Sequence, residues 1–368
     1  MNFSKYTEKL AALAAMSNKY GANADYVLAG GGNTSFKCED YLWIKGSGTA
    51  LATIKAEDFV VMDRKALAKM WTAAYPADEA ARESAVLEDM MAARIPGESR
   101  RPSVETLLHD LFPQAYVLHV HPALVNGLTC SKGGKKEMER LFPDAVWVEA
   151  CKPGYILALE CKKVMDARKA ATGRDVQLLF LENHGIFFAA DTVTELDILA
   201  EQVMDTLAAQ ITKQPDLTPV SFDEAKATAL SALLKSLYGG ESVLFCANTM
   251  IGSYDPKTES LSPDHIVYAK AKQLALPEDA DEETVKTLFA AFEAENGYKP
   301  RIVFWQKGMF ACGNSEKEAA TAQVVMLDAI KVTAYAESFG GVSPMPAFLI
   351  DFIVNWEVER YRSNVSLK

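Results

Sequence analysis

The sequence predicts an α/β protein of two related domains, each with a mostly antiparallel central sheet flanked by helices. Short apolar segments typical of strands alternate with longer segments typical of helices along the 368 residues. A polar stretch with two prolines, residues 213–219, is typical of a linker. A strand and helix pattern around His184 recurs around Lys307. We therefore expect one domain over residues 1–218 and a second over residues 219–368.

The first elements lead into two glycine-rich turns. Residues 4–20 predict a helix, and residues 26–29 predict a short strand that runs into the turn Gly30–Asn33. Residues 41–44 predict another strand, which ends in the turn Lys45–Gly48. The N–H groups and small hydroxyl groups of such turns can bind an anion, although ordinary loops have the same composition. Neither turn has the spacing of a dinucleotide-binding or P-loop motif.

Three of the five histidines fall between residues 101 and 122, after a strand at residues 59–63 and a charged, helical stretch. Residues 117–121, Val-Leu-His-Val-His, predict a buried strand. Residues two apart in a strand point to the same face, so His119 and His121 lie side by side, about 6 to 7 Å apart along the backbone. Two imidazoles placed in this way can bind one metal ion.

A helix and a turn precede this strand. Residues 102–111 predict a helix with Ser103 as N-cap and Glu105 in the first turn. The chain turns at Pro113 and enters the histidine strand. This helix–turn–strand unit can bring the carboxylate of Glu105 over the point at which the two imidazoles converge.

A third histidine strengthens the metal hypothesis. Residues 178–189 predict a second apolar strand, which the polar cluster Glu-Asn-His184-Gly interrupts. Polar residues that conflict with a hydrophobic pattern concentrate at functional sites. Three histidines and a nearby carboxylate match a catalytic zinc site with one open position. A buried His-x-His pair can also be two core imidazoles bonded to backbone. We interpret the other two histidines, His109 and His265, as structural residues. His109 lies one helical turn after Glu105, so it could instead support that carboxylate from behind.

Composition excludes several classes of function. The net charge of −11 disfavours nucleic acid and anionic membranes as partners, while a local positive pocket for a phosphate stays open. None of the six cysteines forms a Cys-x-x-Cys motif, which favours a reduced, cytoplasmic protein. The first residues are charged and amphipathic, so they predict neither a signal peptide nor a membrane span.

The second half contains the predicted repeat. Residues 301–318 align without gaps onto the strand and helix around His184, with Gly308 at the position of Gly185 and Lys307 at the position of His184. The identities are few, so chance similarity of two strand–helix units is the alternative. If the repeat is genuine, the second domain is a degenerate copy without metal ligands.

Five separated motifs resemble the class II aldolase/adducin family. They are Gly-Gly-Asn33-Thr-Ser, Lys-Gly-Ser47-Gly48, Pro-Ser103-Val-Glu105, His119-Val-His121-Pro and Asn183-His184-Gly185. Their order and spacing carry the resemblance over residues 1 to about 212. The variants GGGNTS, KGSG, RPSVETLLH and SPDHIVYAK are most similar to the aldolase part of bifunctional rhamnulose-1-phosphate aldolase/dehydrogenase proteins. The dehydrogenase of those proteins is not expected within these residues, since no dinucleotide-binding fingerprint occurs in them.

The resemblance implies a role for each motif. His119, His121 and His184 would hold Zn²⁺ or another divalent metal, and Glu105 would be the catalytic acid/base. The substrate phosphate would be bound by Gly32, Asn33, Ser47, Gly48 and Ser103. Relatives often have a second hydroxyl residue after the first serine of the Pro-Ser motif, where this chain has Val104, which leaves the identity of the phosphorylated group open. Relatives also use a tyrosine from a neighbouring subunit, which has no assigned counterpart in this sequence.

The resemblance predicts a class II aldolase-like fold and a zinc-dependent aldolase. Its substrate would be a rhamnulose- or fuculose-1-phosphate-like ketose 1-phosphate, cleaved through an enediolate to dihydroxyacetone phosphate and an aldehyde. The expected partners are a small phosphorylated sugar and further copies of the chain, in a tetramer by family resemblance. A sugar-phosphate epimerase or dehydratase on the same scaffold is one alternative. A non-catalytic adducin-like binding module is the other.

Overall fold

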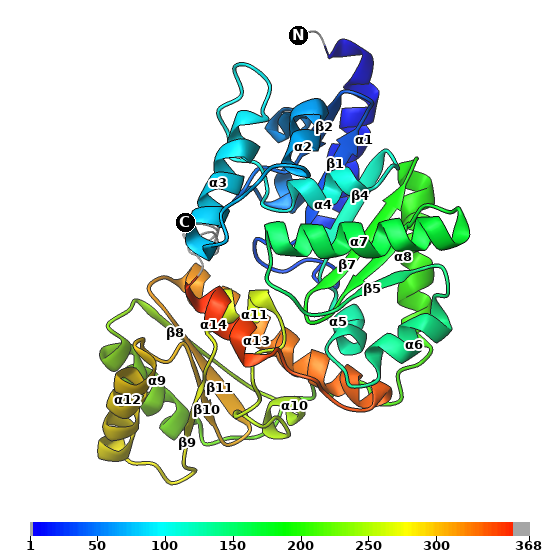
Figure 1. Ribbon diagram of the computed structural model, residues 1–368. Coiled ribbons are helices and arrows are strands. Elements are labelled where there is room, and N and C mark those ends of the chain that lie inside the picture. Colours follow the sequence, from blue (N-terminus) through cyan, green and yellow to red (C-terminus); the bar gives the residue numbers. More distant parts are fainter. Residues whose placement is uncertain (1–2, 356–368) are drawn as a thin grey trace. The chain divides into compact units, whose positions relative to one another are not determined.

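The computed structural model describes residues 3–355 and divides into two compact units (Figure 1). Among the described residues, the first unit comprises residues 3–125 and 135–209, and the second comprises residues 126–134 and 210–355. Each unit has its own sheet and its own buried core, so each is described by itself.

The first unit is built on a seven-stranded sheet in the order β3-β2-β1-β4-β7-β6-β5. The strands are β1 (Asn33–Lys37), β2 (Tyr41–Ile44), β3 (Val60–Asp63), β4 (Tyr116–Val120), β5 (Val146–Val148), β6 (Leu178–Leu181) and β7 (Gly185–Ala190). Neighbouring strands are antiparallel except β5 and β6, which are parallel. The predicted α/β class with a mostly antiparallel central sheet is therefore confirmed.

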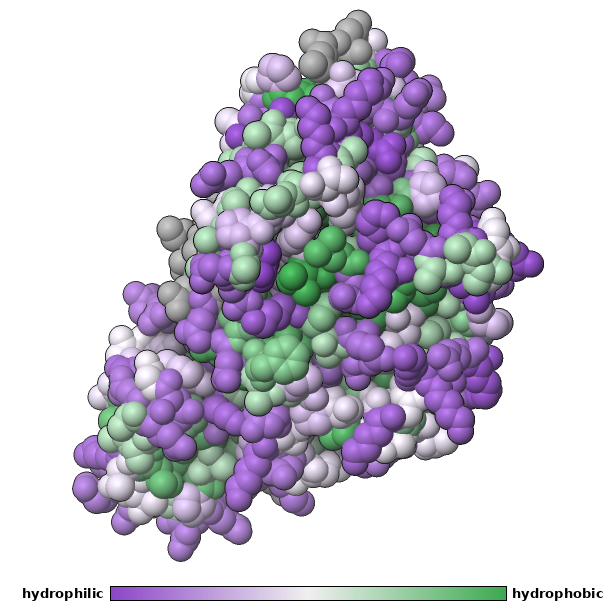
Figure 2. All heavy atoms as spheres, viewed as in Figure 1, coloured by the Kyte–Doolittle hydropathy of each residue, from purple (hydrophilic) through white to green (hydrophobic). Residues whose placement is uncertain are grey.

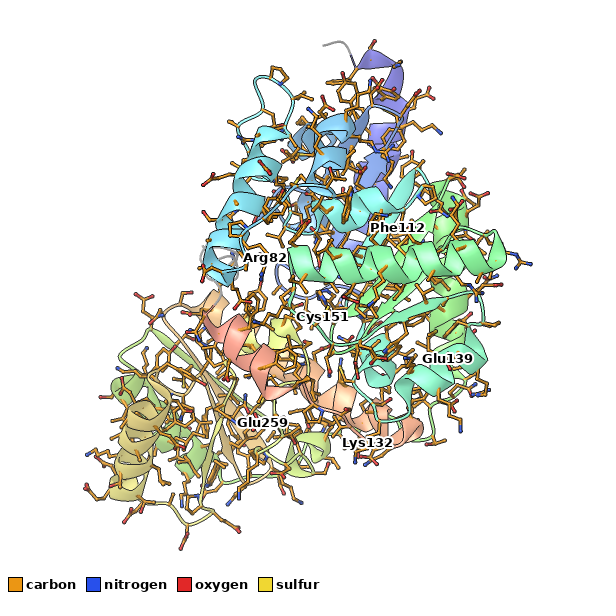
Figure 3. The ribbon with its side chains drawn as sticks, in the orientation of Figure 1. Arg82, Phe112, Lys132, Glu139, Cys151 and Glu259 are labelled. Atoms are coloured by element: carbon orange, nitrogen blue, oxygen red, sulfur yellow. The ribbon has the colours of Figure 1, made fainter. Side chains whose placement is uncertain are left out.

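Helices flank this sheet. They are α1 (Thr7–Gly21), α2 (Arg64–Met70), α3 (Glu79–Ala92), α4 (Thr106–Leu111), α5 (Ala123–Thr129, which continues into the second unit), α6 (Gly134–Leu141), α7 (Tyr155–Thr172) and α8 (Val193–Ala208). Helices α4 and α7 lie on the same face of the sheet (Figure 1). Their buried apolar side chains form one continuous core with those of the strands. Phe112, labelled in Figure 3, follows α4 and is fully buried, with its ring stacked on that of Phe187 at 5.8 Å between centroids.

Three predicted elements differ from the structure. Residues 26–29 form no strand, and β1 begins only at Asn33, because the glycine run that follows Ala29 does not sustain a strand. Helix α4 begins at Thr106, with Glu105 rather than Ser103 as its N-cap residue. Residues 178–189 form a hairpin of two strands, because the polar cluster around His184 is a turn.

The second unit contains a four-stranded sheet in the order β8-β11-β10-β9. Its elements are α9 (Glu224–Tyr238), β8 (Ser242–Ala247), α10 (Thr249–Gly252), α11 (Pro263–Ala269), β9 (Leu274–Leu276), α12 (Glu282–Asn296), β10 (Ile302–Trp305), β11 (Gly308–Gly313), α13 (Glu316–Ala336) and α14 (Ala347–Asn355). Pairs β8–β11 and β11–β10 are antiparallel, and β10–β9 is parallel. The order and the directions repeat those of β4-β7-β6-β5 in the first unit.

Helix caps and turns support the predicted repeat. Thr192 and Ser315 are the N-cap residues of α8 and α13, each seven residues after the glycine that opens the preceding strand, and each accepts a hydrogen bond from the residue three positions on. Asn183 and Gln306 occupy equivalent turn positions and have φ of 54° and 53°. The interpretation of residues 219–368 as a degenerate copy rests on these shared features.

Within residues 3–355, no helix combines the length and the apolar character that a membrane crossing requires.

Helix α6, with the sequence Gly-Lys-Lys-Glu-Met-Glu-Arg-Leu, contributes part of the hydrophilic surface of the first unit, seen as a purple area in Figure 2.

A buried lysine on β1 makes stability depend on pH. Lys37 is 4% exposed, and its Nζ donates to the carbonyl of Gln114 at 2.8 Å. Burial lowers the pKa of Lys37 from 10.5 to about 7, although the negative charge of the Asp110 carboxylate acts to raise it. The unfolded chain therefore binds one more proton than the folded chain between these two values, so the contribution of Lys37 to stability rises with pH in this window and is least favourable below it.

We expect Lys37→Met to stabilise the protein at pH 7 by on the order of 3 kcal/mol, because the methionine removes a buried amine that the unfolded chain protonates at no cost. The gain should shrink as the pH approaches 10, since the unfolded lysine then also loses its proton. Urea unfolding at several pH values measures it, with the exposed Lys65→Met as the matched control. A loss of stability that is the same at every pH would contradict the prediction.

Candidate metal centre

His119 and His121 lie together at the end of β4. His119 is the fourth residue of the strand and is fully buried, and His121 follows its last residue. Their Nε2 atoms face each other at 2.9 Å, and their rings are 4.7 Å apart between centroids. The predicted convergence of the two imidazoles is present in the structure.

His184 reaches the same point from the β6–β7 turn. Asn183 immediately before it is buried and has a left-handed backbone, a conformation that asparagine adopts more readily than most residues. Gly185 after it lies against β4, where a Cβ atom would stand 2.5 Å from the carbonyl oxygen of Val120 and 2.7 Å from the ring of His121. The turn therefore favours asparagine at position 183 and requires glycine at position 185, and together these residues direct His184 toward the pair on β4.

The three histidines offer ring nitrogens that all lie within 4.8 Å of one another. The Nδ1 of His119 lies 3.0 Å from the carbonyl oxygen of Ile186. A carbonyl only accepts, so Nδ1 donates this hydrogen bond and Nε2 is the ring nitrogen that remains for a ligand. The ring of His119 also stacks on Phe187 at 4.0 Å, which fixes its plane. Three converging imidazole nitrogens fit a divalent ion such as zinc, whose bonds to imidazole are about 2.0–2.1 Å long.

Glu105 stands beside this cluster. Its Oε1 lies 3.2 Å from Nε2 of His119 and 3.6 Å from Nε2 of His184, while its Oε2 accepts a hydrogen bond from the amide of Asn33. Burial by itself raises the pKa of Glu105, but the three histidines outweigh burial and hold the pKa well below the usual value of 4.5. The structure therefore places an anionic carboxylate, held by one oxygen, with its other oxygen at the histidine cluster.

The residues predicted for phosphate binding come from three neighbouring segments. The backbone N–H of Ser47 donates to the carbonyl of Arg101 at 2.8 Å, and that of Ser103 donates to the carbonyl of Lys45 at 3.1 Å. These bonds place the turn that contains Ser47 and Gly48 against Ser103, whose hydroxyl accepts the N–H of Glu105 at 3.2 Å. The turn that contains Gly32 is joined to the site through Asn33, which pairs with His119 across β1 and β4.

Two details of these turns were outside the sequence prediction. The side chain of Asn33 binds Glu105, although the sequence assigned it to the phosphate. At Gly32, φ is +71° and a Cβ atom would lie 3.0 Å from the carbonyl oxygen of His119, so a side chain there would press on the metal-site strand. Gly32 therefore has a structural reason to be glycine that is independent of any phosphate.

The two remaining histidines lie outside the cluster. His109 is fully buried, its Nδ1 lies 2.8 Å from Oγ of Ser35, and burial lowers its pKa well below 6.5. His265, in the second unit, lies 3.1 Å from Oδ2 of Asp328 through its Nε2. Sequence reasoning missed Ile186 and Phe187, which orient His119. Phe187 pairs with His119 across β7 and β4. Alternation along β7 was the signal that could have identified Phe187.

Fold and site together define an α/β protein with a cluster of three histidines, which offers nitrogen ligands to a metal ion, and an adjacent carboxylate. The chain belongs to the Class II Aldolase and Adducin family, because the model of the N-terminal domain of that family matches residues 11–211, more than half of the chain. The resemblance on which the sequence prediction rests is therefore confirmed at the level of the family.

One curated relative and two solved structures are similar to this chain. The relative is the uncharacterized oxidoreductase YuxG of Bacillus subtilis (strain 168), 30% identical over 186 residues; these are 48% of this chain, and the match spans about a quarter (26%) of the relative's length. The N-terminal class II aldolase domain of a conserved protein from Thermoplasma acidophilum is 23% identical, with a TM-score of 0.48 over 57% of this chain and 96% of that one. An L-fuculose 1-phosphate aldolase is 18% identical, with a TM-score of 0.39 over 64% of this chain and 98% of that one.

Proposed function

We propose that residues 1–218 form a zinc-dependent aldolase that cleaves a ketose 1-phosphate to dihydroxyacetone phosphate and an aldehyde. The observation that carries this proposal is the arrangement at the end of β4. Three histidine nitrogens lie within 4.8 Å of one another, and Oε1 of Glu105 lies 3.2 Å from one of them. A non-catalytic binding module has no need of a metal centre with a buried carboxylate beside it.

Cleavage of this kind requires two proton transfers and the stabilisation of a negative charge on the substrate. The bond that breaks leaves its electron pair on the carbon that becomes part of dihydroxyacetone phosphate, and this enediolate must then take up a proton. The hydroxyl group on the other carbon loses its proton as the aldehyde forms. A divalent ion held by His119, His121 and His184 would act as a Lewis acid, stabilising the negative charge that develops on the substrate.

Glu105 is the group that we assign to proton transfer at carbon. Its Oε1 is directed to the metal centre, whereas Oε2 is occupied by the Asn33 amide. This division leaves one oxygen for the reacting carbon while the other keeps the side chain in place, as a general acid/base requires. Asn33 then acts as a positioning residue for Glu105, in addition to any contact with the phosphate.

The phosphate of the substrate would be bound by Gly32, Asn33, Ser47, Gly48 and Ser103. We expect Ser47→Ala to lower kcat/KM roughly tenfold to hundredfold for a ketose 1-phosphate, the range for a lost hydrogen bond to a charged group, because a remote phosphate contributes binding energy at the reacting carbons. The unphosphorylated ketose should be affected much less. Ser99→Ala, in a neighbouring exposed loop, is the matched control. Equal losses for both substrates would count against a phosphate role for this turn.

The proposal is tested by a turnover screen of ketose 1-phosphates, including rhamnulose and fuculose 1-phosphates, with coupled detection of dihydroxyacetone phosphate. An aldolase releases that product from at least one of them. An epimerase or dehydratase consumes the sugar phosphate without releasing it, and an adducin-like binding module consumes none. The last two outcomes would each replace the proposed reaction.

Further properties of the proposal follow the family. We propose an assembly of several copies, tetrameric by family resemblance, and a cytoplasmic location, which agrees with six cysteines that are thiols and not disulfides. The description of the Bacillus relative as an oxidoreductase refers to a protein of which this chain matches about a quarter.

A further inference from the structure

The second unit contains a pocket of about 240 Å³ at the β10–β11 turn. Phe222, Phe245 and Trp305 provide its aromatic walls, and Glu278, Gln306 and Lys307 provide polar groups. The volume is slightly below the range of about 300–1,000 Å³ that is usual for ligand pockets, which limits the occupant to a small molecule.

This pocket occupies the position of the metal centre in the repeated topology. Phe310 stands two residues after Gly308 and pairs with Phe245, as Phe187 stands two residues after Gly185 and pairs with His119. The two aromatic contacts also correspond, because Phe245 lies 4.6 Å from Phe310 and His119 lies 4.0 Å from Phe187, measured between ring centroids. The second unit therefore keeps the location of the site while its residues differ.

The substituted residues exclude a metal from this position. Phe245 stands at the position of His119, and Lys307 stands in the turn at the position of His184. By the same register Ala247 stands at the position of His121. A phenyl ring, a methyl group and an ammonium group offer no lone pair to a cation at neutral pH, so any occupant is recognised by other means.

The pocket is lined by aromatic rings and by polar side chains of both charges. Phe222 is 39% exposed and lies 4.8 Å from Phe245 at an interplanar angle of 67°, so an apolar ring is presented to the pocket without being covered. Nε2 of Gln306 lies 3.4 Å from Oε1 of Glu278, next to the ammonium-bearing Lys307. One carboxylate and one ammonium leave no strong net charge among the lining side chains.

We propose that this pocket binds a neutral monosaccharide. A sugar ring has an apolar C–H face that packs on an aromatic ring, and its hydroxyl groups each donate and accept hydrogen bonds. The pocket supplies both needs, because the aromatic rings of Phe222 and Phe245 line it together with an acceptor, an amide and a donor. The site is independent of the metal centre, and the proposal does not rest on the aldolase reaction.

Saturation-transfer NMR on the full chain tests the proposal, with D-glucose, D-galactose, D-mannose, L-rhamnose and L-fucose as probes at millimolar concentration. We expect at least one of these sugars to bind, and Phe222→Ala to weaken that binding about tenfold. Glu278→Gln should also weaken it, because a hydroxyl group loses a charged acceptor. Phe348→Ala, which removes another exposed phenylalanine of the second unit, should leave binding unchanged.

His184→Ala separates this pocket from the metal centre, since binding that depends on the second unit persists in that variant. Lys307→Met should retain full metal content, because Lys307 is not a ligand. The proposal is overturned if none of the sugars binds, if binding is equal in the wild type, Phe222→Ala and Glu278→Gln, or if only phosphorylated forms of the same sugars bind. Loss of sugar binding in His184→Ala would assign it to the first unit and would also overturn the proposal.

Discussion

Replacing Glu105 with glutamine should slow cleavage of the ketose 1-phosphate by roughly 10²–10⁴-fold, the usual contribution of a general acid/base. Glutamine keeps the shape of the side chain and can still accept the hydrogen bond from Asn33, but it cannot carry the proton. The variant should fold and keep its metal, because the three histidines are unchanged. Exchange of the dihydroxyacetone phosphate C–H proton with solvent, followed by NMR in deuterated water, should fall in parallel.

The exchange measurement distinguishes the possible roles of this carboxylate. Solvent exchange isolates the proton transfer from cleavage of the carbon–carbon bond. If cleavage falls while exchange stays near the wild-type rate, Glu105 positions the substrate and another group carries the proton. If Glu105→Gln loses the metal, the carboxylate is primarily a fourth ligand. Glu149→Gln, a carboxylate on the exposed surface that pairs with Lys135, is the control and should change neither rate.

Replacing a histidine of the cluster should remove the metal. We expect the purified protein to carry about one divalent ion per chain, most often zinc, and His119→Ala or His184→Ala to lose most of it. Three nitrogen ligands reduced to two should lower the affinity by more than 10²-fold, since removal of an outer partner alone costs about 10–100-fold. Metal analysis by mass spectrometry measures the result.

Lys307→Ala is the matched control for this experiment. Lys307 directly precedes the glycine that opens β11, as His184 directly precedes the glycine that opens β7, so the control changes the corresponding position in a turn that is one residue shorter. Its metal content should equal that of the wild type. Full metal occupancy in both histidine variants would refute the three-histidine centre, and loss of metal in Lys307→Ala would mean that the two units share one site.

The convergence of the histidines could be predicted from sequence because strand geometry is strict. Alternation along residues 117–121 placed His119 and His121 on one face before any contact was known, and the structure brings their Nε2 atoms to 2.9 Å. His184 was also identified, although for an incomplete reason. Its polar neighbours interrupt a hydrophobic run because a tight turn stands there, and Asn183 adopts the left-handed backbone that the turn needs. The same pattern thus had a structural cause as well as a functional one.

Contacts between distant segments could not be predicted in this way. The hydrogen bond between Asn33 and Glu105 joins residues 72 positions apart, and it depends on how β1 and α4 pack against each other. The start of α4 was placed too early because Ser103 is a good N-cap residue by type, yet its hydroxyl accepts the N–H of Glu105 in the turn that precedes the helix. Local preference identified the right residues there, and tertiary packing decided their partners.

The central claim is that the three histidines and Glu105 form a metal-dependent centre that generates an enediolate from a phosphorylated ketone. Its most direct test is deuterium incorporation into dihydroxyacetone phosphate, measured by NMR with the full chain after metal removal and again after zinc is restored. This measurement does not depend on which aldehyde the natural substrate contains. We predict stereospecific incorporation of one deuteron with the zinc-restored protein and none above background with the metal-free protein. Equal incorporation in both states, or none in either, would contradict the account.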